Sequence, residues 1–315
     1  MGIFAKRRTR AQQTLALSHH DEGCALAVID HATAAAPALV RAEWFAGDPA
    51  RSAALLARHA REHRLGRVSC VSLIEPNDYS LVLVDTPEVP PAELRAAMRW
   101  RVKELIDFHI DDAVIDVFDV PTEDGRAARR MYAVAARSER VQRAAAAAQG
   151  AGLALEVVDI PEFALRNLAV RLPEDGTGVA LIHFEARHGL LTVGRRGALY
   201  FSRRLDGGRE RLLHAGPALT PAMEGQLDAL TIEIQRSLDF YERHFAQPSI
   251  GAIVLAGLPQ PVAGMPDYLQ SQLGVATRWL DFGAILRPSI EIPQDLLARC
   301  TLAIGAALRR PEHAA

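Results

Sequence analysis

Apolar positions along the chain fall into short runs and helical stripes whose order occurs twice. The first copy is predicted as three strands, a helix and a strand, at residues 14–18, 24–30, 40–45, 49–65 and 67–74. The second copy has the same order, at residues 177–184, 188–194, 198–205, 221–245 and 250–256. A duplicated unit of this kind predicts an α/β protein with two similar lobes, each a mixed sheet covered by helices.

The long helix of the second copy gives the clearest periodic signal. Its apolar residues follow one another in steps of three and four and therefore lie on one face. They are Met223, Leu227, Leu230, Ile234, Leu238, Tyr241 and Phe245. In the first copy the polar cluster at residues 19–23, His-His-Asp-Glu-Gly, predicts the turn between the first two strands.

Extra sequence between the two copies predicts an inserted β-α-β-β subdomain over residues 77–137. Its strands are expected at residues 79–86, 113–120 and 129–136, with a turn at Thr122–Gly125. Its helix is expected from Pro90 to about Ile106, with Leu94, Met98, Val102 and Leu105 as the buried stripe. We therefore expect lobe I to span residues 1–171 and lobe II residues 172–315, with the C-terminal helix packing back on lobe I.

Composition narrows the function classes. The chain is 49% hydrophobic and 23% charged with a net charge of −2, so no global field attracts nucleic acid. Three distant cysteines without CxxC spacing indicate a reducing compartment, and Cys24 and Cys70 lie in strand-like runs typical of a core. No apolar region follows the basic run Lys6–Arg10, which therefore is not a signal peptide; it is a solvated terminus or an arm for anionic lipid.

Four segments in order carry a resemblance to a known family. They are residues 98–105 (MRWRVKEL) with 112–119 beyond them, 233–242 (EIQRSLDFYE), 253–257 (IVLAG) and 303–309 (AIGAALR). The chain resembles the PilM-like pilus-assembly family, and within it the branch that serves MSHA pilus biogenesis.

The resemblance implies an actin-like (ASKHA, FtsA/PilM-type) duplicated two-lobe fold with an inserted subdomain. It also implies a cytoplasmic scaffold, peripheral to the inner membrane, that binds the cytosolic N-terminal peptide of a bitopic partner similar to PilN or MshJ. No nucleic-acid partner is expected.

The family's nucleotide motifs are altered in this chain. Where the first lobe of the family has Ile-Asp-Ile-Gly, this sequence has Leu-Ala-Leu-Ser ending at Ser18, and the second-lobe Asp-hydrophobic-Gly becomes His183-Phe184-Glu185. The adenosine-side double glycine is reduced to Gly257-Leu258. Since Mg²⁺ needs carboxylates and phosphate needs close backbone N–H groups, we expect a degenerate cleft and no cofactor. The alternative is an active ATPase or kinase of this fold that binds Mg-ATP between the lobes.

The candidate partner-binding residues are Trp100, Leu105 and Phe108, at the edge of a peptide groove beside the inserted subdomain; the alternative for each is a core position. His59-Ala-Arg-Glu-His63 matches the inverted zincin pattern on a helix, but a third ligand is not evident. We therefore expect no metal site, no catalytic residue and no enzymatic activity.

Overall fold

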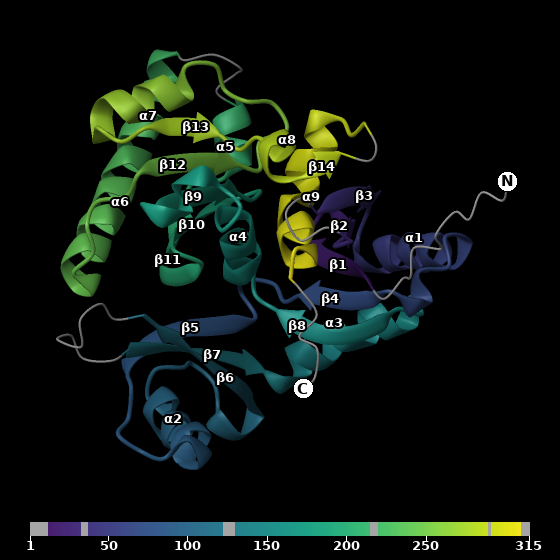
Figure 1. Ribbon diagram of the computed structural model, residues 1–315. Coiled ribbons are helices and arrows are strands. Elements are labelled where there is room, and N and C mark those ends of the chain that lie inside the picture. The colour runs from purple at the N-terminus through teal and green to yellow at the C-terminus, as the bar shows by residue number, and fades with distance from the viewer. Residues whose placement is uncertain (1–11, 33–36, 122–129, 215–219, 289–290, 310–315) are drawn as a thin grey trace, which may run out of the picture.

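The computed structural model describes residues 12–32, 37–121, 130–214, 220–288 and 291–309, and it contains three sheets (Figure 1). The sheet of lobe I has the order β14-β3-β2-β1-β4-β8, with strands β1 Gln13–His20, β2 Gly23–Asp30, β3 Ala38–Ala46, β4 Ser69–Leu73, β8 Ala154–Asp159 and β14 Arg287–Pro288. The sheet of lobe II has the order β11-β10-β9-β12-β13, with strands β9 Val179–Phe184, β10 His188–Arg195, β11 Ala198–Asp206, β12 Ala252–Ala256 and β13 Thr277–Trp279.

The two sheets share one topology. In lobe I, β1 pairs antiparallel with β2 and parallel with β4. In lobe II, β9 pairs antiparallel with β10 and parallel with β12. The expected duplication of two mixed sheets is therefore confirmed at the level of strand order and direction.

Helices cover both faces of the two lobe sheets. They are α1 Pro49–Glu62, α3 Ser138–Gly150, α4 Pro161–Ala169, α5 Arg209–His214, α6 Pro221–Phe245, α7 Met265–Leu273, α8 Phe282–Ile285 and α9 Gln294–Ala307, with 3₁₀ turns η2 Leu65–Arg67, η3 Pro91–Glu93, η4 Ile110–Asp112 and η5 Pro173–Gly176. Figure 1 shows α4 and α9 between the two sheets, α1 and α3 on the outer side of lobe I, and α6 and α7 on the outer side of lobe II.

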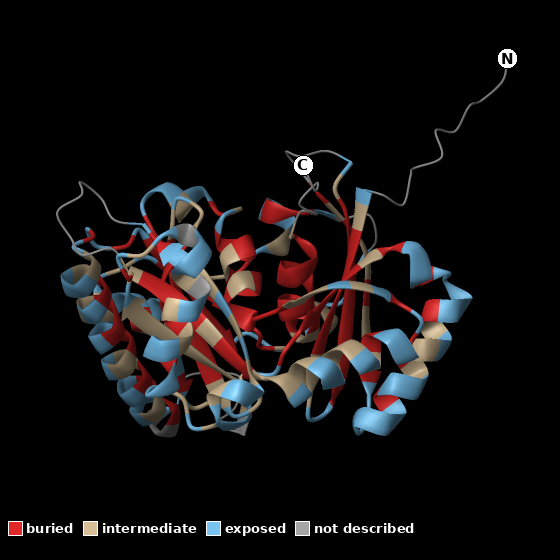
Figure 2. Ribbon diagram, turned by 90° about the horizontal axis from the view of Figure 1, so that it is seen from below, coloured by how far each residue is buried: buried red, intermediate tan, exposed pale blue. Residues whose placement is uncertain are grey.

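Alternation along the strands explains this layering. Leu15 and Leu17 point to the outer core with α1, while Ala16 between them faces the central core with α9. The small side chain of Ala16 lets α9 approach the sheet, and α9 is buried over most of its length (Figure 2). The central core contains residues of both sheets, which joins the lobes.

The inserted part forms its own sheet of order β5-β7-β6, with strands β5 Tyr79–Asp85, β6 Ala113–Val120 and β7 Arg130–Arg137. Helix α2 Leu94–Lys103 covers one face through Met98 and Val102. The other face turns toward lobe II, where the Tyr132 hydroxyl donates to the carbonyl of Tyr200 at 3.1 Å. The expected β-α-β-β insertion is confirmed.

Several details differ from expectation. Strand β1 continues through His19 and His20, which pair with Cys24 and Gly23, so the turn comprises only Asp21 and Glu22. Helix α1 ends at Glu62 because Arg64 takes the left-handed conformation with φ of 53°. Leu105 is 53% exposed because α2 has ended at Lys103, and the stripe no longer faces the sheet.

Short elements α5, α8 and β14 were not predicted. β14 pairs with β3, so the chain returns from lobe II to the sheet of lobe I before α9. The division between residues 171 and 172 stays a prediction. The basic run Lys6–Arg10 and the turn Thr122–Gly125 lie outside the described residues.

Candidate functional site

A small cleft lies where the two equivalent hairpin turns of the lobes meet. Its lining includes Ser18 and Glu22 from the β1–β2 hairpin and Glu185 and Arg187 from the β9–β10 turn. The cavity measures about 130 Å³. Sites for drug-sized ligands usually measure about 300–1,000 Å³. The cleft is therefore small for a nucleotide.

The chain's own charges bridge this cleft. Arg209 of α5 donates to a carboxylate oxygen of Glu22 at 2.8 Å, and Arg299 of α9 lies 3.7 Å from the same oxygen. A carboxylate from lobe I therefore meets guanidinium groups of lobe II and α9 at the place where two phosphate-binding turns would face each other. These contacts tie the β1–β2 hairpin of lobe I to α5 and α9 and occupy the space between the two turns.

The backbone of the β9–β10 turn is hydrogen-bonded to the start of helix α5. The amide of Arg209 donates to the carbonyl of Glu185 at 2.7 Å, and the amide of Glu210 donates to the carbonyl of Ala186 at 3.0 Å. A Cβ at Gly208 would lie 2.4 Å from the Glu185 carbonyl, so glycine is needed for this contact. Burial raises the pKa of the Glu185 carboxyl to about 7.

His183 and Gly257 lie behind the cleft and do not line it. The imidazole of His183 is buried, and burial lowers its pKa to about 3, so the ring is neutral. Gly257 has φ of +90°, and a Cβ there would lie 2.6 Å from the His183 ring nitrogen. The imidazole thus fills the end of β9, and Gly257 borders a separate cavity of about 10 Å³.

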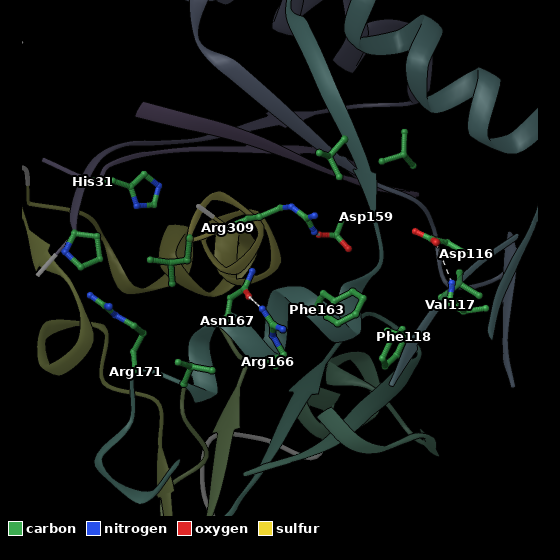
Figure 3. Close-up of a pocket in the computed structure, with 16 residues that line it drawn as sticks. His31, Asp116, Val117, Phe118, Asp159, Phe163, Arg166, Asn167, Arg171 and Arg309 are labelled. Atoms are coloured by element: carbon green, nitrogen blue, oxygen red, sulfur yellow. Dashed lines mark hydrogen bonds and ion pairs between the residues drawn. The ribbon is translucent and has the colours of Figure 1, made fainter. Parts of the chain in front are cut away.

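A much larger groove of about 810 Å³ lies beside the inserted subdomain (Figure 3). Two edge strands flank it: β8 at the edge of the lobe I sheet and β6 at the edge of the inserted sheet. Helix α4 and the end of α9 complete its walls. Its lining residues are His31, Pro37, Asp116, Val117, Phe118, Val134, Val157, Val158, Asp159, Phe163, Arg166, Asn167, Val170, Arg171, Leu308 and Arg309.

Some of the charged side chains in this groove already have partners within the chain. Arg309 pairs with Asp159 at 2.9 Å, and burial raises the pKa of the Asp159 carboxyl although Arg309 opposes the shift. Arg166 donates to Asn167 at 2.9 Å and lies over the Phe163 ring at 5.2 Å. The Nε of Arg166 is buried without a hydrogen-bond partner among the described residues. A ligand acceptor in the groove would satisfy this donor.

The edge strands offer backbone groups as well. On β6 the amide of Val117 donates to its neighbour's side chain, Asp116 Oδ1, at 3.0 Å (Figure 3). Edge strands present backbone groups that an added strand can pair with. Phe118 and Val134 supply apolar contacts on the groove side of the inserted sheet.

The three residues proposed from sequence for partner binding do not line this groove. Helix α2 covers the opposite face of the inserted sheet, and Trp100 on its outer side is 75% exposed, so Trp100 is not a core residue. Leu105 is also exposed, whereas Phe108 is partly buried against the α2 core, with Arg137 over its ring at 4.5 Å.

The groove residues that sequence analysis missed come from β6, β8, α4 and the end of α9. The one local signal in the sequence is Pro161, which begins α4 directly after β8. The His59 and His63 rings do lie close, at 4.3 Å. Among the residues that the structure describes, no cluster of three or more metal-ligating side chains occurs. Within the same residues, no helix has the length and apolar character needed to cross a bilayer.

The chain is similar to known proteins in part of its sequence and in its whole fold. Residues 83–214 match the family described as type IV pilus assembly protein PilM. The PilM–PilN type IV pilus biogenesis complex is similar over 94% of this chain and 97% of that chain, at 23% identity and a TM-score of 0.72. No curated protein sequence matches the chain.

The cytoplasmic domain of EpsL, an inner-membrane component of the type II secretion system of Vibrio cholerae, is similar over 92% of this chain and 93% of that chain. Its identity is 13% and its TM-score is 0.50. Because both identities are below 25%, the two similarities establish a shared fold and no more. The whole chain thus has the actin-like two-lobed fold that was expected, and its residues 83–214 are similar to the PilM type IV pilus assembly family.

Proposed function

We propose that this chain is a scaffold of a type IV pilus inner-membrane assembly platform, of the MshI type that serves MSHA pilus biogenesis. It acts on the cytoplasmic side and reaches the inner membrane through a bitopic partner similar to PilN or MshJ. The match to the PilM family over residues 83–214 supports the assembly role, and the likeness to a PilM–PilN complex supports a PilN-like partner.

The observation that carries the proposal is the groove between the edge strands β6 and β8. An extended peptide can pair its backbone with an open sheet edge while its alternate side chains enter pockets. Here the groove offers apolar side chains such as Phe118, Phe163 and Val170, and the unpartnered Nε of Arg166. We therefore assign the partner's cytosolic N-terminal segment to this groove.

The inter-lobe cleft is proposed to be degenerate and without hydrolytic activity. Its volume of about 130 Å³, the Glu22–Arg209 pair and the buried His183 support this view. Mg-ATP would require the cleft to open and the ion pair between Glu22 and Arg209 to break.

Calorimetric titration of the purified chain with a synthetic peptide of the partner's N-terminal segment tests the proposal, with Mg-ATP titrated separately. We expect peptide binding and no turnover of ATP. Val170→Asp places a charge on an exposed apolar position of the groove, and Arg166→Met removes the unpartnered donor. Arg166→Met is expected to weaken peptide binding about tenfold or more, since losing a buried charged hydrogen bond costs about 1.5–3 kcal/mol. Val170→Asp is expected to weaken peptide binding as well, because the bound peptide would bury an unpaired carboxylate.

The matched control is Ile232→Asp, at an apolar position on α6 of lobe II that is also exposed. It should leave peptide affinity unchanged. Peptide binding that tolerates both groove variants would move the site elsewhere, and steady ATP turnover would favour an ATPase or kinase instead.

A further inference from the structure

A basic surface lies around the C-terminal end of α1. Arg58 and Arg61 are exposed on the helix, and Arg64 and Arg67 are exposed in the turn that follows. We call these four residues the basic corner. Glu62 is the acidic residue within residues 58–67, and its carboxylate oxygen lies 3.9 Å from Nε of Arg58. Within the described residues, no ion pair involves Arg61, Arg64 or Arg67, although the whole chain carries a net charge of −2.

The fold holds the basic corner in place. Leu65, between Arg64 and Arg67, is only 7% exposed and belongs to the outer core of lobe I. A Cβ at Gly66 would lie 2.7 Å from the carbonyl of Gly152, so the turn packs tightly on the chain after α3. The arginines therefore project from a fixed segment. Figure 1 places α1 on the outer side of lobe I, away from lobe II.

Arg64 adds a second, independent observation. Its φ of 53° and ψ of 45° put it in the left-handed conformation just beyond the helix end. Glycine is the usual residue at this position because a Cβ is disfavoured there. A side chain kept in such a conformation lowers stability, and residues of this kind often serve a role outside the fold.

We propose that the basic corner docks the chain directly onto an anionic lipid surface. Guanidinium groups bind phosphate through paired hydrogen bonds, and arginines near an anionic bilayer each add to binding. The corner contains no Phe, Trp or Tyr on which nucleic-acid bases could stack. The choice of a membrane as the anionic surface rests on the proposed function at the inner membrane.

The corner also lacks exposed apolar side chains, so contact with the membrane is electrostatic and shallow. Such binding weakens as salt screens the charges. It would supplement the partner peptide, since a peptide in the groove and arginines on a bilayer give one chain two points of attachment.

Sedimentation of the full chain with vesicles tests the proposal without the partner. We expect binding to mixed phosphatidylglycerol–phosphatidylcholine vesicles at low salt and none to pure phosphatidylcholine vesicles. Arg61→Gln with Arg67→Gln should weaken partitioning roughly 25-fold, at roughly fivefold per arginine. The control pair Arg236→Gln with Arg243→Gln removes the same charge from the exposed face of α6 and should have little effect.

Arg64→Gly separates binding from folding. It should weaken vesicle binding roughly fivefold while raising the melting temperature, because glycine adopts the left-handed conformation freely. A merely structural arginine would not give opposite signs in the two measurements.

Three results would overturn the proposal: equal binding to both kinds of vesicle, equal losses in the two double variants, or binding of duplex DNA without binding of vesicles. Peptide titration of the same variants should be unchanged, because the basic corner is not part of the groove. Failure of the lipid proposal therefore leaves the peptide result intact, and the reverse also holds.

Discussion

Glu185 and His183 show how single residues set the character of the inter-lobe cleft. The pKa of the Glu185 carboxyl is raised to about 7 by burial, and the pKa of His183 is lowered to about 3 by burial. Both shifts disfavour the charged forms. At the end of β9, where a metal-binding carboxylate would serve a nucleotide, the chain therefore carries a neutral imidazole and a carboxyl that loses its proton reluctantly.

Glu185→Gln is expected to change the pH dependence of stability. The pKa of the Glu185 carboxyl is about 7 in the folded chain, above its ordinary value of 4.5. The wild type therefore has its full stability from this group below pH 4.5 and loses that stability as pH rises through 7. Glutamine does not ionise, so the variant does not lose stability over this range. Above pH 7 it should be more stable than the wild type by about 1–2 kcal/mol, with partial solvation taken into account.

The histidines provide the contrast in the same experiment. The lowered pKa values of His20, about 4, and His183, about 3, stabilise the fold above pH 6.5 and cease to do so as pH falls. The free energy of unfolding from urea titrations between pH 4.5 and 8 should therefore rise more steeply with pH in Glu185→Gln than in the wild type. Parallel profiles would show that Glu185 ionises normally.

At the residue scale the sequence indicated which nucleotide motifs are altered, but not which contacts now bridge the cleft. Ser18 and Glu185 do line the cleft, as their positions in the hairpins suggested. The pairing of Glu22 with Arg209 joins residues 187 positions apart, and neither residue belongs to a motif. Contacts of this kind depend on how the lobes close, which the local pattern of residues does not encode.

The strands and long helices were predictable because each one has to bury a regular stripe. Helix α6 runs from Pro221 to Phe245 as its seven apolar positions predicted, and Thr220 caps it by accepting from the amide of Met223. The short elements α5, α8 and β14 escaped prediction because two to six residues carry too little periodicity. The groove escaped it because β6, β8, α4 and α9 meet only in the folded chain.

Helices α4 and α9 cross at one close contact that supports a prediction at the scale of elements. A Cβ at Gly305 of α9 would lie 2.3 Å from the carbonyl of Ala164 in α4. The carbonyl of Gly305 also accepts from Asn167, a residue of the groove, at 3.0 Å. Glycine is therefore needed where the two helices between the lobes touch.

Gly305→Ala should destabilise the fold by about 1–3 kcal/mol, because even one methyl group forces the helices apart in a packed core. Gly225→Ala in α6 is the matched control, since nothing lies within 4 Å of its Cβ position. That substitution should stabilise by about 0.5–1 kcal/mol through helix propensity. Thermal unfolding of both variants measures the contrast, and a shift in the same direction for both would contradict the tight crossing.

Over the whole molecule, one buried carboxylate connects the inserted sheet, helix α4 and lobe II. Glu162 in the first turn of α4 accepts from the Tyr79 hydroxyl of β5 at 2.5 Å and from the Ser202 hydroxyl of β11 at 3.3 Å. Burial raises the pKa of the Glu162 carboxyl, and its hydrogen bonds oppose that shift. The proposed peptide groove borders this junction through Phe163 and Arg166, so the geometry of the groove depends on it.

Tyr79→Phe removes one hydroxyl from this junction without changing the shape of the ring. Because a buried carboxyl then loses a donor, the free energy of unfolding should fall by about 1–3 kcal/mol in urea titrations. Tyr268→Phe removes a comparable bond, to Asp228, on the exposed surface of lobe II. There water replaces the lost partner, and the change should stay within about 0.5 kcal/mol. Equal losses in the two variants would mean that the buried Glu162 carboxyl does not depend on its hydrogen bond from Tyr79.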